Sequence, residues 1–280
     1  SESAGLTVDH FVVIRGVSEG IDLVTRAVAG PKRPVVSFAP TFPMYRHWAA
    51  IANAPYRELD GFPLWEQARL PGELPRQARL FWLCNPNNPT GHLLSTETIA
   101  RFARRVRAIV AVDETYVEFT GARSAAQLVA SHPNVVVARS LSKAWMLAGD
   151  RVGVLIAHPS IARVFRAIQG PYAVPATTLR RLAALPARRA RTADCVAAIA
   201  KERNRLVTKL EALALPIIVH RTRANFLYLS SPKAPKAVDA LRSAGFWVNG
   251  DDASGLRLAI RSPRENDRIV RELERFFRGC

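Results

Sequence analysis

The sequence predicts an α/β fold with a mostly parallel sheet that carries helices on both faces, followed by a smaller α+β domain at the C-terminus. Two observations support this fold class. Short apolar runs of β type alternate with helical patterns along most of the chain, and a long helical stretch then precedes a part that mixes short strands and helices. Such alternation is typical of right-handed βαβ crossovers. We place the domain boundary so that a large domain covers 1–188 and a small domain covers 189–280.

Local patterns predict the individual elements. Apolar runs predict strands in the large domain at 11–14, 35–39, 80–84, 109–113, 134–138 and 152–157. Helical spacing, with Ser95 as an N-cap, predicts helices after Gly16 and at 95–107, 124–130, 159–168, 177–185 and 189–213. The small domain is expected to contain strands at 217–220, 225–229 and 256–260, and helices at 234–243 and 264–277. Residues 57–79 show only weak periodicity and are interpreted as a connection.

A lysine, Lys143, lies on a short loop between the strands expected at 134–138 and 152–157. Burial of an ammonium group costs several kcal/mol unless the group is paired or deprotonated, and desolvation lowers its pKa toward a nucleophilic amine. An amine in that state forms imines with carbonyl compounds. Taken alone, the lysine is typical of a surface turn, so its interpretation depends on two upstream segments.

These two upstream segments are strands that end in polar side chains. Pro86 and Pro89 keep the asparagines before them extended, so their loop can aim the amide of Asn88 into a cleft. Asp113 ends the next strand, and Tyr116 follows three residues later. Ligands of open α/β sheets bind outside the carboxyl ends of the strands. We therefore expect amide, carboxylate, phenol and lysine to converge on one site.

The turn at Gly16 is a candidate anion site. A strand, a glycine turn and a helix N-terminus together form a phosphate cradle, because unpaired backbone N–H groups and the helix dipole point at the anion. From the sequence, this turn either binds a phosphate or simply caps the following helix.

In combination, these segments resemble the fold-type I pyridoxal-phosphate aminotransferases of class I and II, and they look most like the histidinol-phosphate aminotransferase family. The resemblance runs from about Val12 to the C-terminus, and its motifs come in the family's order at 15–22, 40–45, 85–91, 113–116 and 140–151. One motif match is a weak hypothesis, whereas this ordered set leaves little room for coincidence. The family's N-terminal arm has no counterpart before Ser1.

The resemblance implies pyridoxal 5'-phosphate as the cofactor and three catalytic residues. Lys143 would bind the cofactor covalently and move a proton, and Asp113 would keep the pyridine nitrogen protonated. Tyr116 would hydrogen-bond the phenolic oxygen of the cofactor together with Asn88. The remaining cofactor-binding residues implied by the resemblance are Val17, Ser18, Ser142 and Arg151 at the phosphate and Phe42 on the ring.

The resemblance also implies a substrate site. Arg257 lies where the family has an arginine that binds the anionic group of the substrate, and Asn88 would border the same space. Histidinol-phosphate enzymes usually carry a second anion-binding arginine where this chain has Ser230. An arginine from another position, Arg221, Arg223 or Arg261, could compensate for this departure.

The resulting hypothesis is a transaminase that moves an amino group to 2-oxoglutarate, with L-histidinol phosphate as the amino donor. Three alternatives stay open at this point. The chain could act on another amino acid or a secondary-metabolite precursor, could be a phosphothreonine-type decarboxylase on the same scaffold, or could be a truncated homologue without activity. Joint retention of Lys143, Asp113, Tyr116, Asn88 and Arg151 argues against loss of activity, since folding does not require that set.

Composition narrows the remaining classes. The net charge of +17 would suggest nucleic acid as a partner, but the basic residues are scattered over expected helices without an aromatic-interleaved stretch, so we expect no nucleic-acid partner. The chain shows no membrane-spanning run or secretion signal, and we expect a cytoplasmic homodimer with small-molecule substrates. The three cysteines and six histidines show no metal-ligand spacing, so we predict no metal site.

Overall fold

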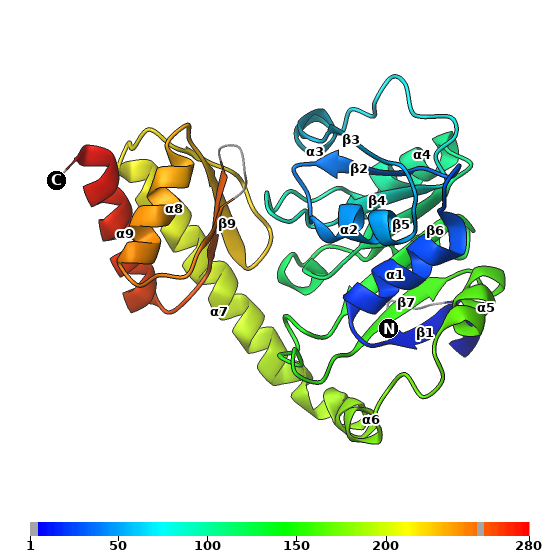
Figure 1. Ribbon diagram of the computed structural model, residues 1–280. Coiled ribbons are helices and arrows are strands. Elements are labelled where there is room, and N and C mark those ends of the chain that lie inside the picture. Colours follow the sequence, from blue (N-terminus) through cyan, green and yellow to red (C-terminus); the bar gives the residue numbers. More distant parts are fainter. Residues whose placement is uncertain (1–4, 251–254, 280) are drawn as a thin grey trace.

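The computed structural model describes residues 5–250 and 255–279. A large lobe and a small lobe are joined by the long helix α7 (Leu185–Ala212), which runs between them (Figure 1). The boundary that we placed after residue 188 falls in the first turn of this helix. Within the described ranges, no helix combines the length and the apolar character that crossing a bilayer requires.

The large lobe is built on one sheet. Its strands lie in the order β1-β7-β6-β5-β4-β2-β3, with β2 to β6 forming parallel pairs and β7 antiparallel to both β6 and β1. The bounds are β1 (Phe11–Ile14), β2 (Val35–Ala39), β3 (Tyr56–Asp60), β4 (Leu80–Cys84), β5 (Ile109–Asp113), β6 (Val135–Ser140) and β7 (Gly153–Ala157). The prediction of a mostly parallel sheet is confirmed.

Helices cover both faces of this sheet, as the alternation of side chains along β4 shows. Leu80 and Trp82 belong to the core beneath α1 (Val17–Val28), α2 (Met44–Ile51) and α5 (Pro159–Ile168). Phe81 and Leu83 belong to the opposite core, beneath α3 (Phe62–Gln67) and α4 (Thr96–Arg105). Successive side chains of a strand point to opposite faces, so a strand buried on both sides is apolar throughout.

The small lobe has an antiparallel sheet, one face of which packs on the lobe's own helices. Its strands lie in the order β10-β11-β9-β8, and their bounds are β8 (Ile218–Val219), β9 (Phe226–Ser230), β10 (Asn249–Gly250) and β11 (Gly255–Ala259). Leu227, Leu229 and Leu258 pack with α7, α8 (Ala234–Ser243) and α9 (Pro263–Arg278). The alternate residues of β9 and β11 therefore face away from this core, toward the large lobe.

Several elements differ from the sequence-based expectations. The region 57–79 contains β3 and α3 rather than a plain connection. β3 is an edge strand with largely exposed side chains, and α3 has only six residues, so neither gives a strong periodic pattern. The helix expected at 124–130 is the 3₁₀ turn η3 (Ala125–Leu128). Further short elements are η1 (Val8–His10) and η2 (Val117–Phe119), whereas α6 (Ala176–Ala183) corresponds to the helix expected at 177–185.

Candidate active site

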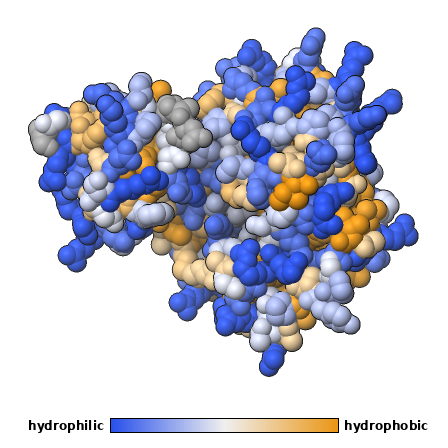
Figure 2. Space-filling model, in the orientation of Figure 1, coloured by the Kyte–Doolittle hydropathy of each residue, from blue (hydrophilic) through white to orange (hydrophobic). Residues whose placement is uncertain are grey.

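The candidate site lies where three central strands of the large sheet end and face the small lobe. In the parallel register, Cys84, Asp113 and Ala138 are neighbours. The polar residues that follow them therefore lie at the same edge of the sheet. Backbone bonds tie these ends together, since Asn85 N–H donates to the carbonyl of Asp113 over 2.8 Å. Figure 2 shows that the molecular surface is indented along the seam between the two lobes.

Lys143 lies on the loop between β6 and β7, as predicted. The residue is exposed, but its Nζ reaches over the ring of Tyr116, 5.8 Å from the ring centroid. Partial burial of the amine, followed by repulsion from the guanidinium groups of Arg257 and Arg151, lowers its pKa, while the carboxylate of Asp113 opposes this change. The amine is thereby moved toward its neutral, nucleophilic form.

Asp113 is a buried carboxylate, only 3% exposed, at the end of β5. Its Oδ1 accepts hydrogen bonds from the backbone N–H and the hydroxyl of Thr115, at 3.0 and 2.6 Å. Its Oδ2 accepts a bond of 2.9 Å from the hydroxyl of Tyr45. Burial nevertheless raises the pKa of Asp113, because these neutral donors and the distant Lys143 offset the desolvation only in part. A cation placed against this carboxylate would stabilise its charged form.

Sequence reasoning missed Tyr45. This tyrosine is fully buried on α2, and its ring stacks on Trp82 of β4 with centroids 4.8 Å apart and planes 3° from parallel. Stacking fixes the direction in which the hydroxyl points, and the hydroxyl holds Asp113. The signal available in the sequence was the motif at 40–45, which ends in this tyrosine but does not name its partner.

The three asparagines of the loop after β4 differ in burial and in hydrogen bonding. Asn85 and Asn87 are buried and bonded within the protein, Asn85 to the backbone of Leu94 and Asn87 to Thr41 and Thr90. Asn88, the predicted ligand, is half-buried, and its side chain makes no hydrogen bond within the described part of the chain. Asn88 is therefore the asparagine whose amide is available to a bound molecule.

Arg151 and the Gly16 turn, both predicted at the phosphate, lie together. Gly16 has φ +77° and is the N-cap of α1, so Val17 and Ser18 form the first turn of that helix. A Cβ atom at Gly16 would lie 2.8 Å from Nη2 of Arg151. The guanidinium group thus packs directly on the turn, and this contact leaves no room for a side chain there.

Ser142 and Phe42 complete the predicted set. The backbone N–H of Ser142 donates to Oγ of Ser140 over 3.1 Å, and Ser140 is buried at the end of β6. Sequence reasoning chose Ser142 and overlooked Ser140, although both lie in the same motif. Phe42 is half-buried and makes an edge contact with Tyr45, with centroids 5.8 Å apart.

The small lobe contributes Arg257, on β11. Its guanidinium group lies over the ring of Phe226, 4.1 Å from the centroid, and its Nη2 donates a bond of 3.3 Å to the hydroxyl of Tyr116. Its Nε is buried without a hydrogen-bond partner within the described residues. Burial raises the pKa of Tyr116 to about 12, although the charge of Arg257 opposes that rise. The guanidinium group of Arg257, which has one unused donor, therefore lies beside the phenol of Tyr116 and acts on the amine of Lys143.

This chain belongs to a known family of enzymes. It matches the family described as aminotransferase class I and II over residues 2–273, which defines it as a pyridoxal-phosphate-dependent aminotransferase. It is 39% identical to the histidinol-phosphate aminotransferase of Stenotrophomonas maltophilia (strain R551-3) over 285 residues, which is 96% of this chain and 78% of the relative. The enzyme of the same name from Xylella fastidiosa (strain Temecula1 / ATCC 700964) is 34% identical over 95% of this chain and 77% of its own length. Within the class, the chain belongs to the histidinol-phosphate aminotransferase family.

Solved structures share the fold. The histidinol-phosphate aminotransferase of Sinorhizobium meliloti, in complex with pyridoxal-5'-phosphate, superposes with a TM-score of 0.84 at 21% identity, covering 98% of this chain and 78% of that one. The L-threonine-O-3-phosphate decarboxylase of Porphyromonas gingivalis superposes with a TM-score of 0.81 at 21% identity, covering 96% and 86%. At such identities the likeness concerns the fold alone, and it confirms the predicted architecture.

Proposed function

We propose that this aminotransferase moves the amino group of L-histidinol phosphate to 2-oxoglutarate. The observation that carries this proposal is the sequence similarity to histidinol-phosphate aminotransferases along nearly the whole chain. The retained set of lysine, carboxylate, phenol and two arginines in one cleft supports the same chemistry.

The residues present fit pyridoxal phosphate. Among the described residues, the buried carboxylate of Asp113 has no close cationic partner, which suits a protonated ring nitrogen. The amide of Asn88 is unused by the same part of the chain, and the guanidinium of Arg151 covers a glycine turn at a helix N-terminus, which suits a phosphate. When bound, the cofactor supplies an electron sink for the carbanion that forms at the substrate carbon.

The chain's own residues would then have distinct tasks. The amine of Lys143 would attach the cofactor and afterwards move the proton from the substrate carbon. Asp113, held by Tyr45 and Thr115, would fix the charge state of the cofactor ring. Tyr116 and Asn88 would hydrogen-bond the ring oxygen, and Phe42 would stack on the ring face. Ser142, Arg151 and the backbone of Val17 and Ser18 would hold the phosphate.

On the substrate side, Arg257 would bind the anionic group. Its buried Nε is the unsatisfied donor that an acceptor on the substrate would complete. The compensating arginine remains a proposal as well. Arg261 donates to the carbonyl of Trp247 and pairs with Glu265, whereas Arg221 and Arg223 are exposed. We therefore favour Arg221 or Arg223 over Arg261 for this task.

We further propose a cytoplasmic homodimer, for which the family resemblance is the support. Sedimentation of the purified protein tests the assembly. A monomer that turns over at a normal rate would contradict it.

The first experiment is a visible absorbance spectrum of the protein with added pyridoxal phosphate, repeated with Lys143→Ala. We expect a cofactor band that is lost in the variant. Turnover of L-histidinol phosphate, phosphothreonine and aromatic amino acids with 2-oxoglutarate then tests the substrate. A faster reaction with an aromatic amino acid, or release of carbon dioxide from phosphothreonine, would overturn the substrate assignment while leaving the cofactor assignment intact.

A further inference from the structure

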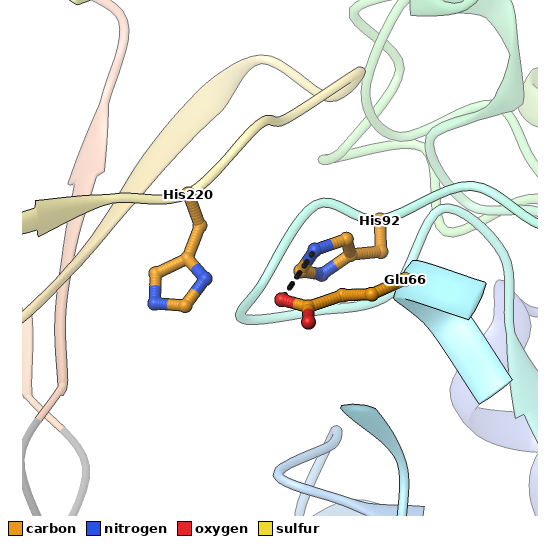
Figure 3. Close-up of side chains that lie close together, drawn as sticks. All are labelled: Glu66, His92 and His220. Carbon is orange, nitrogen blue, oxygen red and sulfur yellow. Dashed lines mark ion pairs between the residues drawn. The ribbon is translucent and has the colours of Figure 1, made fainter. Parts of the chain in front are cut away.

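Three residues that are far apart in the sequence meet at the seam between the lobes. Glu66 lies on α3, His92 follows the loop after β4, and His220 follows β8 in the small lobe (Figure 3). Each offers one ligand atom, and these atoms lie within 4.8 Å of one another. The mechanism proposed above uses none of the three.

The backbone brings the two halves of this cluster together. Gly91, next to His92, has φ +75°, and its carbonyl accepts a bond of 2.9 Å from the backbone N–H of Arg223. A Cβ at Gly91 would lie 2.9 Å from Cα of Thr222, so the large-lobe loop touches the small-lobe segment directly. His92 and His220 are therefore brought opposite each other by main-chain contact, and their rings also meet edge to face with centroids 5.9 Å apart.

The ring of His220 is oriented for a ligand. Its Nε2 lies 2.7 Å from Oγ of Ser230, and its ring packs on Tyr228 with centroids 5.1 Å apart. Figure 3 shows that one ring nitrogen of His220 is turned toward His92. Because Nε2 is engaged by Ser230, the nitrogen that faces the cluster is Nδ1. A histidine whose other nitrogen is fixed by a hydrogen bond is typical of metal ligation.

His92 completes the pair on the large lobe. Its side chain is 11% exposed, its ring stacks on Trp65, and its Nε2 lies 3.8 Å from a carboxylate oxygen of Glu66, which is beyond hydrogen-bond distance. Its Nδ1 is buried without a partner in the described ranges. Burial lowers the pKa of both histidines.

We propose that Glu66, His92 and His220 bind one divalent transition-metal ion of the zinc class between the two lobes. Two imidazole nitrogens and one carboxylate oxygen are the donor set of a three-ligand zinc site, whose fourth position takes water. Two ligands on one tetrahedral zinc ion lie about 3.4 Å apart, given bonds of about 2.1 Å, so ligand atoms that are up to 4.8 Å apart must approach by up to about 1.4 Å. The half-exposed side chain of Glu66 supplies part of this movement.

Such an ion would clamp the lobes beside the catalytic cleft. Tyr228, which packs on His220, is paired with Arg257 in the β9–β11 register, so both lie on the same face of the small-lobe sheet. Metal binding would therefore restrain the face that presents Arg257. This inference goes beyond the transaminase reaction and does not depend on it.

Calorimetric titration of the cofactor-loaded protein with Zn²⁺, after dialysis against a chelator, tests the site. We expect one equivalent per chain in the wild type and none at micromolar metal in His92→Ala and His220→Ala. The exposed His47 serves as the matched control, and His47→Ala should bind like the wild type. Co²⁺ in place of Zn²⁺ should give ligand-field bands that disappear in the same two variants.

Two further variants keep the test decisive should an alanine variant fail to fold. Glu66→Gln removes a partly exposed carboxylate and should weaken binding while the protein stays folded. Ser230→Ala should weaken binding by about 10-fold, because it frees the Nε2 side of His220. Absence of zinc binding in the wild type would overturn the proposal. So would zinc binding that survives in all four variants, which are His92→Ala, His220→Ala, Glu66→Gln and Ser230→Ala.

Discussion

Nη2 of Arg257 donates a hydrogen bond of 3.3 Å to the hydroxyl of Tyr116, and this bond joins the small lobe to the large lobe at the centre of the candidate site. The same guanidinium lies against Phe226, whose ring in turn meets Tyr116 edge to face at 5.1 Å. Arg257 is thus positioned by packing before any substrate arrives. Burial and then the charge of Arg257 lower the pKa of Lys143.

Replacement of Arg257 by lysine should impair substrate recognition. Lysine keeps the charge but loses the planar fork of donors, so the hydrogen bonds to the anionic group are not reproduced. Loss of a charged hydrogen bond costs about 1.5–3 kcal/mol, which is about 10- to 100-fold in kcat/KM. Steady-state kinetics measure this loss, with Arg271→Lys on the exposed side of α9 as the control. An equal loss in both variants would show that Arg257 has no specific role.

Replacement of Tyr45 by phenylalanine should alter the titration of Asp113. The variant keeps the stacking on Trp82 but removes a hydrogen bond to the charged form of the carboxylate. The pKa of Asp113 should therefore rise further, because a donor to its charged form is lost. The acidic limb of the rate profile should move to higher pH. An unmoved profile, equal to that of the control Tyr172→Phe, would contradict this role.

Glu114 should make the stability of the large lobe depend on pH. It is fully buried and bonded by Ser124 and Ala125, and burial raises its pKa to about 7 from the usual 4.5. The native state therefore holds the proton more tightly than the unfolded chain. The resulting stabilisation is present below pH 4.5 and is lost as the pH rises to 7, by up to about 3 kcal/mol.

Urea unfolding of the wild type and of Glu114→Gln between pH 4.5 and 8 measures this dependence. The variant cannot ionise, so the difference in free energy of unfolding between the two proteins should shrink as the pH rises to 7 and then stay level. Glu211→Gln, at an exposed position of α7, controls for the loss of one surface charge. A difference that does not vary with pH would refute the buried titration.

The sequence predicted most clearly the strands that are buried on both faces of the sheet. β4, β5 and β6 are buried on both faces, and their apolar runs marked them clearly. β3 lies at the sheet edge with its side chains mostly exposed, so no comparable run exists there. The prediction that Asn88, Asp113 and Lys143 lie at one edge of the sheet came from one rule, because parallel strands end at a common edge.

Contacts between distant segments could not be read in the same way. The bond from Tyr45 to Asp113 joins residues 68 positions apart, and its geometry depends on the stacking of Tyr45 on Trp82. Likewise, Glu66, His92 and His220 have no metal-like spacing in the chain, and only the approach of the two lobes brings them together. Neither the bond nor the cluster can be predicted from a local sequence pattern, because both depend on how distant elements pack against each other.

The contact between Gly91 and Thr222 sets how closely the lobes approach, and Gly91→Ala should separate them. A Cβ at Gly91 would lie 2.0 Å from Oγ1 and 2.5 Å from Cβ of Thr222, and the residue has φ +75°. Left-handed backbone costs a non-glycine residue about 1–2 kcal/mol, and overpacking adds about 1–3 kcal/mol. Gly121→Ala is the matched control, because Gly121 has φ +67° but no atom within 4 Å of an added Cβ.

Both variants therefore have a strained left-handed backbone, and only Gly91→Ala adds the steric overlap with Thr222. Urea unfolding should show the larger loss of stability in Gly91→Ala, and activity should fall only in that variant, because Asn88 and the small lobe are displaced together. Thr222→Gly combined with Gly91→Ala removes the overlapping Thr222 side chain, although not its Cα. This pair should recover part of the activity that Gly91→Ala loses. Equal losses in Gly91→Ala and Gly121→Ala would mean that the loop and the small lobe are not in direct contact in solution.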